Sequence, residues 1–157
     1  MAIDKVREYL KQWGREGDIL EFDSSSATVE LAANALGVAP GRIAKTLSFK
    51  TQDGALLVIA AGDAKIDNAK FKSEYGLKAK MLTPEEVVEY TGHAIGGVCP
   101  FAVKSDVAVY LDISLKRFET VYPACGSSNS AIELTIKELE KYSGYSQWID
   151  VCKGWND

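Results

Sequence analysis

A run of seven apolar residues at positions 55–61 constrains the fold of this 157-residue chain more than any other feature. The run is far too short to cross a membrane, and its length and flanking turn residues are typical of a strand that is buried on both faces. The preceding residues 46–51 alternate between polar and apolar side chains, and Gln52-Asp53-Gly54 predicts a turn between the two segments. The sequence therefore predicts a β-hairpin whose second strand lies inside a covered sheet.

Helices and further strands are expected on both sides of this hairpin. Helical spacing of apolar residues predicts an amphipathic helix over residues 3–13, and two capping-box patterns begin at Thr83 and Thr135. The other expected helices are residues 29–36, 66–72 and 114–119, with a single turn at 40–43; the other expected strands are residues 19–22, 107–111, 121–122, 131–134 and 148–151. Strands paired by hairpins and interleaved with helices favour an α/β (α+β) domain with a mixed sheet over a doubly wound parallel sheet.

Composition excludes several classes of protein. We expect one domain over residues 1–157, because this length supports one core and no repeat or domain boundary is visible. The 18 Lys plus Arg against 22 Asp plus Glu give a net charge of −4, which argues against general coating of DNA. No apolar run approaches a membrane span and the charged start is unlike a signal peptide, so we expect a cytoplasmic protein without a membrane partner. Cys99, Cys125, Cys152 and a single His93 predict neither a disulfide framework nor a metal site.

Two segments carry candidate chemistry. Lys45 and Thr46 place a cation and a hydroxyl where the predicted turn meets the hairpin, although a solvated lysine is an equally good interpretation. Gly96 and Gly97, followed by Pro100, predict a tight loop with exposed main-chain N–H groups, because glycine permits positive φ and proline fixes the exit. Such a loop can hold an oxyanion or a phosphate, while a plain connection is its commoner use.

Other segments have weaker signals. The small, polar residues 124–130 predict either a second pocket wall or a hairpin turn. Cys99 and His93 could form a nucleophile and base, but no third residue orients the imidazole, and cysteine is often a small buried hydrophobe. The densest positive stretch contains Lys65, Lys70 and Lys72, which is typical of a solvated face and is also suited to a phosphate backbone.

Taken together, these motifs resemble the YbaK/EbsC family, the freestanding relatives of the editing domain inserted in bacterial prolyl-tRNA synthetase. The resemblance covers about residues 19–151, and its motifs are LGV (36–38), IAKTL (43–47), AAGD (60–63), TGH (91–93), GGVCPF (96–101), 111–112 and 126–134. It implies a compact α/β domain built on a curved, mixed, largely antiparallel sheet with surrounding helices. It also implies hydrolysis of the ester between a wrong amino acid and the 3′ end of a tRNA.

The resemblance also assigns roles to residues. The family's lysine falls on Lys45 and its Gly-x-x-x-Pro loop on residues 96–100, so the expected catalytic residues are Lys45, Gly96, Gly97, Val98, Cys99 and Pro100. The expected substrate-binding residues are Phe22, Thr46, His93, Phe101, Gly126 and Ser127. The density of positive charge, and not the resemblance, makes Lys65, Lys70 and Lys72 the residues expected to contact the tRNA backbone. No metal or other cofactor is expected, and the chain departs from the family pattern at Cys99, Ala124 and residues 127–129.

The expected function is aminoacyl-tRNA editing in trans, for example on proline tRNA carrying Cys, Ala or another wrong amino acid. Water would attack the activated ester, the N–H groups of residues 97–99 would stabilise the oxyanion, and Lys45 would hold an oxygen of the terminal adenosine. The alternative is a non-catalytic tRNA- or oligonucleotide-binding module associated with a synthetase. A thiol hydrolase based on Cys99 is the weakest hypothesis. The preferred function requires Lys45 and the Gly96-Gly97 loop to line one cleft.

Overall fold

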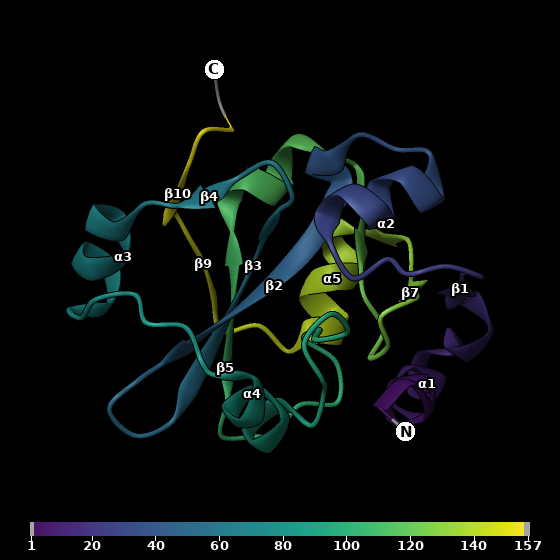
Figure 1. Ribbon diagram of the computed structural model, residues 1–157, viewed down its shortest axis with the longest axis horizontal. Helices are drawn as coiled ribbons and strands as arrows, with labels where there is room; N and C mark the ends of the chain where they lie inside the picture. Colours follow the sequence, from purple (N-terminus) through teal and green to yellow (C-terminus); the bar gives the residue numbers. More distant parts are fainter. Residues whose placement is uncertain (1, 156–157) are drawn as a thin grey trace.

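The computed structural model describes residues 2–155 and has a strongly twisted central sheet (Figure 1). This six-stranded sheet has the order β8-β6-β2-β3-β5-β9. Its strands are β2 (Ile43–Lys50), β3 (Ala55–Ala61), β5 (Ala108–Asp112), β6 (Thr120–Pro123), β8 (Leu134–Thr135) and β9 (Gln147–Ile149). The expected hairpin is β2 and β3, which pair antiparallel along seven residue pairs.

The sheet is mixed, as predicted. The pairs β2–β6, β3–β5 and β5–β9 are parallel, while β6–β8 is antiparallel like the hairpin. Two short antiparallel pairs lie outside the main sheet: β1 (Leu20–Glu21) with β7 (Ser130–Ala131), and β4 (Lys65–Ile66) with β10 (Cys152–Lys153). Four of the seven strand pairs within residues 2–155 are therefore antiparallel, which confirms the largely antiparallel arrangement.

Helices surround the sheet (Figure 1). The α-helices of the described residues are α1 (Ala2–Leu10), α2 (Val29–Leu36), α3 (Asn68–Tyr75), α4 (Pro84–Thr91) and α5 (Ile136–Ser143). Both predicted capping boxes form: Thr83 caps α4 together with Glu86, and Thr135 caps α5 together with Glu138. The expected turn at 40–43 and helix at 114–119 are 3-10 helices, η3 (Pro40–Arg42) and η4 (Ile113–Arg117).

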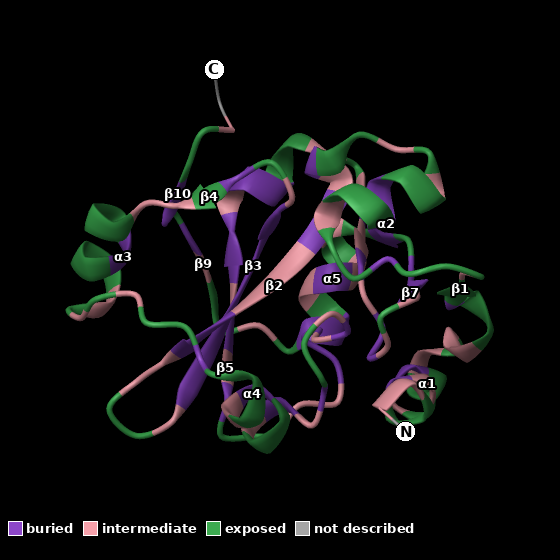
Figure 2. Cartoon of the chain, in the orientation of Figure 1, coloured by how far each residue is buried: buried purple, intermediate pink, exposed green. Residues whose placement is uncertain are grey.

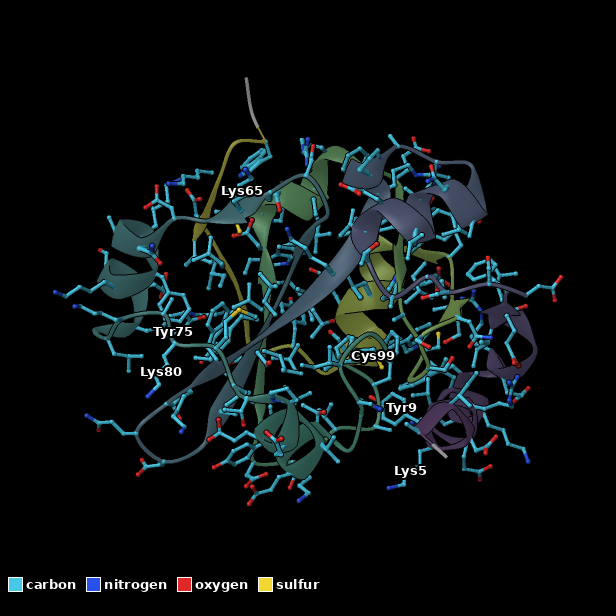
Figure 3. All side chains as sticks on the ribbon, viewed as in Figure 1. Lys5, Tyr9, Lys65, Tyr75, Lys80 and Cys99 are labelled. Atoms are coloured by element: carbon cyan, nitrogen blue, oxygen red, sulfur yellow. The ribbon has the colours of Figure 1, made fainter. Side chains whose placement is uncertain are left out.

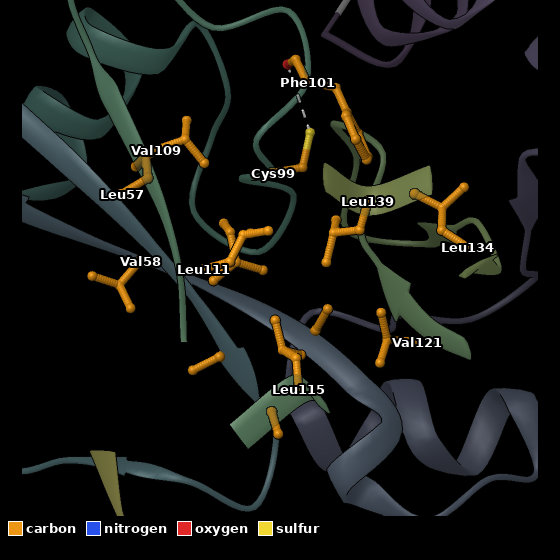
Figure 4. Packing of buried hydrophobic residues seen from close by; sticks show 14 of the residues in the cluster. Leu57, Val58, Cys99, Phe101, Val109, Leu111, Leu115, Val121, Leu134 and Leu139 are labelled. Carbon is orange, nitrogen blue, oxygen red and sulfur yellow. Dashed lines mark hydrogen bonds between the residues drawn. The ribbon is translucent and has the colours of Figure 1, made fainter. Parts of the chain in front are cut away.

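The core lies along β3 and β5. All seven residues of β3 are buried, as the continuous apolar run predicts, and Figure 2 shows this strand enclosed between more exposed elements. Leu57 of β3 and Leu111 of β5 pack in one cluster with Leu115, Leu134 and Leu139 (Figure 4). Burial of such side chains is the main stabilising contribution in a domain of this size.

Candidate active site

Strand β2 lies between β3 and β6, and the middle of β2 is unpaired along the edge that faces β6, called the outer edge below. On that side β6 pairs only with the first two residues of β2. A bridge between Phe49 and Met81 covers the far end of the strand. Within residues 2–155, the stretch 45–47 therefore has no strand partner on this edge.

A cavity of about 270 Å³ lies at this gap. Its walls are β2, the N-terminal part of α2, residues 81–87 at the start of α4, the loop around Gly96 and the segments that follow β6 and form β7. Small side chains make room for it, including Ala32, Ala44, Ala124 and Ala131. Among the described lining residues Lys45 is the one ionised side chain, so the cavity is mainly apolar with a single cation.

Lys45 is held in place by main-chain carbonyl groups of the turn after β3. Its Nζ donates to Gly62 O at 3.4 Å and to Ala64 O. A Cβ at position 62 would lie 2.2 Å from Pro40 O, so the close approach requires glycine there. Burial lowers the pKa of the half-buried Lys45 amine, an effect that the charge of nearby Asp63 opposes. An ammonium has three donors, and two of them are used here, so one remains for a ligand.

The Gly-rich loop lines the same cavity through Gly96 and Val98. Gly96 has φ +95°, which only glycine adopts readily. Gly97 N–H donates to Ala94 O at 3.0 Å, and Gly97 O accepts from Gly126 N–H at 3.0 Å. The Gly97 N–H is therefore already used within the turn, contrary to its expected role as an oxyanion donor. In the described part of the chain, the N–H groups of Gly96 and Val98 make no hydrogen bond.

Three expected site residues lie in the core and not on the cavity wall. Cys99, Phe101 and His93 are at most 1% exposed. His93 Nε2 lies 2.8 Å from Phe101 O and 3.6 Å from Cys99 Sγ, and Figure 4 shows the contact from Cys99 to Phe101 O. Burial raises the pKa of the Cys99 thiol to about 12 and lowers the pKa of His93. The thiol is therefore protonated near neutral pH, so it lacks the thiolate that nucleophilic attack requires.

A second layer of expected residues stands behind the wall. Phe22 N–H donates to Asn129 O at 2.8 Å, and Ser127 Oγ donates to Ser130 Oγ at 2.7 Å. Gly126 has φ +94° and joins this layer to the Gly-rich loop. Ser130 lines the cavity, whereas Phe22, Gly126 and Ser127 are not among its lining residues. These three support the wall from outside.

Sequence reasoning missed the wall that residues 26–29 form at the start of α2. Its one local signal was Thr28, which caps the helix by accepting from Leu31 N–H at 3.2 Å. Tyr122 of β6 also lines the cavity and was expected only as a strand residue.

None of the lysines expected to contact tRNA lines the cavity, although the charge of Lys65 helps to lower the pKa of the nearby Lys45 amine. Lys65 is in β4, while Lys70 and Lys72 are on α3, which stands at the opposite end of the view from α2 (Figures 1 and 3). Lys70 Nζ pairs with Asp150 Oδ1 at 3.0 Å. Lys72 lines a separate, basic groove together with Lys78.

The described residues contain neither a helix suited to cross a bilayer nor a cluster of metal-ligating side chains. No helix within residues 2–155 has the length and apolar character needed to cross a bilayer. No group of three or more His, Cys, Asp or Glu side chains in the same range is placed to hold a metal ion.

The described residues form an α/β fold with a lysine-bearing, mainly apolar cavity at an unpaired stretch of the sheet. Residues 23–142 match the model of the aminoacyl-tRNA editing domain, so the chain belongs to that family. This confirms the family that the sequence motifs suggested.

Relatives cover either the whole chain or a part of a larger enzyme. The uncharacterized protein YwhH of Bacillus subtilis (strain 168) is 60% identical over 156 residues, 99% of each chain. The proline--tRNA ligase of Bacillus pumilus (strain SAFR-032) is 27% identical over 120 residues, 71% of this chain. The chain spans 21% of that ligase's length.

Solved structures share the whole fold. A candidate trans-editing enzyme for prolyl tRNA synthetase is 32% identical, with a TM-score of 0.87 and 98% of each chain covered. The hypothetical protein APE2540 is 31% identical, with a TM-score of 0.82, covering 95% of this chain and 99% of the other. These matches confirm the expected editing-domain fold.

Proposed function

We propose that this protein hydrolyses the ester of a mischarged tRNA in trans, in the compartment where translation takes place. The observation that carries the proposal is the convergence of Lys45 with Gly96 and Val98 on one cavity, in a chain of the editing family. The cavity's small, apolar walls suit an uncharged amino acid such as alanine or cysteine. Proline tRNA is the proposed carrier, because relatives include proline--tRNA ligases and a candidate trans-editing enzyme for prolyl tRNA synthetase.

The proposed reaction needs neither a covalent intermediate nor a metal. Water adds to the ester carbonyl, the bond to the ribose oxygen breaks, and that oxygen takes a proton, leaving a free amino acid and an uncharged tRNA. The substrate's own hydroxyl or amine serves as the base. The N–H groups of Gly96 and Val98 and the remaining donor of Lys45 stabilise the oxyanion, and one such donor typically contributes about 2.7–4 kcal/mol.

The rest of the tRNA is proposed to contact the basic residues outside the cavity. Lys65 and Lys72 are exposed, whereas Lys70 forms an ion pair with Asp150. These residues therefore supply a weak and salt-dependent attraction to phosphates. A synthetase is proposed as a partner that delivers the mischarged tRNA.

A panel of mischarged tRNAs tests the proposal. Alanyl-, cysteinyl-, seryl- and prolyl-esters of proline tRNA are incubated with the protein, and released amino acid is compared with release in buffer. We expect release from at least one wrong ester and much slower release from the prolyl ester. Salt-sensitive tRNA binding with release equal to buffer for every ester would favour the non-catalytic module instead.

Substitution of Cys99 by alanine is expected to change the deacylation rate by less than about threefold. The reason is that the thiol is buried, protonated and outside the cavity. Single-turnover release from a mischarged tRNA measures the rate, and circular dichroism confirms that the variant is folded. A 100-fold lower deacylation rate in a folded Cys99→Ala variant would show that Cys99 takes part in the reaction.

A further inference from the structure

The main-chain polar groups of β2 alternate between the two edges of the strand. Thr51 N–H donates to Gly54 O at 2.9 Å across the hairpin, so odd-numbered residues face β3. Ser48 O accepts from Leu82 N–H at 3.2 Å, so even-numbered residues face the outer edge. Thr46 therefore directs both its N–H and its C=O into the gap, where the cavity lies.

Nothing in residues 2–155 bonds to these two groups. The ladder from β6 ends with the pair Ala44 and Pro123. The chain then leaves β2, and Gly126 N–H donates to Gly97 O instead. The Thr46 Oγ1 atom is also buried without a hydrogen-bond partner. One residue thus presents an unmet donor, an unmet acceptor and an unmet hydroxyl beside a mainly apolar cavity, which is unusual for buried polar groups.

We propose that the aminoacyl group of the substrate completes the β-ladder opposite Thr46. In a hydrogen-bonded antiparallel pair, two residues exchange both of their N–H to O=C bonds. An aminoacyl ester is a single residue that carries an amine and a carbonyl, so it can form one such pair. The amine donates to Thr46 O, and the ester carbonyl accepts from Thr46 N–H.

This inference rests on the proposed function and specifies how the substrate is recognised. Thr46 binds the free amine and the carbonyl of an L-amino acid, which are common to the amino acids. Selection by side chain is then left to the apolar walls, including Ala124 and Ala131. The pairing also supplies an oxygen partner for the amine in a cavity whose described lining carries no carboxylate.

Amide hydrogen exchange with a stable substrate analogue tests this pairing. The probe is 3′-(L-alanylamino)-3′-deoxyadenosine, in which an amide replaces the ester, and the control is the propanoylamino compound, which lacks the amine. In the free protein we expect Thr46 N–H to exchange about 100-fold faster than the N–H groups of Lys45 and Leu47, which face β3. The alanyl compound should slow exchange at Thr46 alone among the three. The control should bind about tenfold more weakly or worse, because it lacks the amine that donates to Thr46 O.

Four outcomes would overturn the pairing. It is wrong if Thr46 N–H already exchanges as slowly as its neighbours, if the alanyl compound binds without slowing it, if the two compounds bind equally, or if neither binds. Protection of Thr46 in a protein that releases no amino acid from the tRNA panel would reject the proposed hydrolysis and keep the pairing. Release of amino acid by a protein in which the alanyl compound does not protect Thr46 N–H would keep the proposed hydrolysis and reject the pairing.

Discussion

Replacing Lys45 by alanine is expected to lower the deacylation rate by about 100-fold or more. The side chain supplies the one cation on the described cavity wall, and its Nζ is fixed by Gly62 O and Ala64 O. A donor that is already oriented stabilises developing negative charge without reorganisation. Loss of this donor therefore lowers the rate of the chemical step. Single-turnover release from a mischarged tRNA measures this step.

Lys50→Ala is the matched control, since Lys50 lies on the same strand but pairs with Glu86 at 2.6 Å, outside the cavity lining. Its rate should stay near that of the wild type. The pH dependence provides a second readout. Burial lowers the pKa of Lys45, so its ammonium form and the rate that depends on it are lost at a lower pH than for an ordinary lysine. Equal rates for the Lys45→Ala and Lys50→Ala variants would exclude Lys45 from the reaction.

Replacing Gly97 by alanine is expected to lower both the deacylation rate and the free energy of unfolding. A Cβ there would lie 2.7 Å from Ser127 N and 2.8 Å from Gly126 C, and main-chain atoms cannot move aside as a flexible side chain can. The loop must shift and lose the bond from Gly126 N–H to Gly97 O, which displaces Gly96 and Val98 from the cavity wall. We expect a destabilisation of about 1–3 kcal/mol and a fall in rate of about 100-fold.

Chemical denaturation and single-turnover release measure the two effects. Gly17→Ala is the control, because nothing lies within 4 Å of a Cβ at that position. It should be neutral in both measurements. A Gly97→Ala variant with the stability and rate of the wild type would show that the loop does not depend on its close packing against residues 126–127.

The elements with strong local patterns could be predicted from the sequence. The hairpin of β2 and β3 follows from alternation and an apolar run, and both capping boxes follow from side-chain spacing. The expected strand at 131–134 is instead divided between two partners. Ala131 pairs with Leu20 in one sheet and Leu134 with Val121 in another, and no local pattern contains that information.

The candidate site was predictable only in part. Lys45 and the Gly-rich loop were identified, and the structure brings Lys45, Gly96 and Val98 to one cavity, as the preferred function requires. The gap in the sheet could not be predicted, because it depends on where β6 leaves β2. For the same reason the loop sequence could not show that Cys99 faces the core while Val98 lines the cavity.

The central claim is that this cavity holds the ester that is hydrolysed. The most direct test is the release of alanine from alanylated proline tRNA by the wild type and by Ala124→Phe, which fills the cavity from its wall. Ala35→Phe, at an exposed position of α2 outside the lining residues, is the control. The account predicts rapid release by the wild type and the control, and release at the buffer rate by a folded Ala124→Phe protein. Equal release by all three proteins, or no release by the wild type, would contradict it.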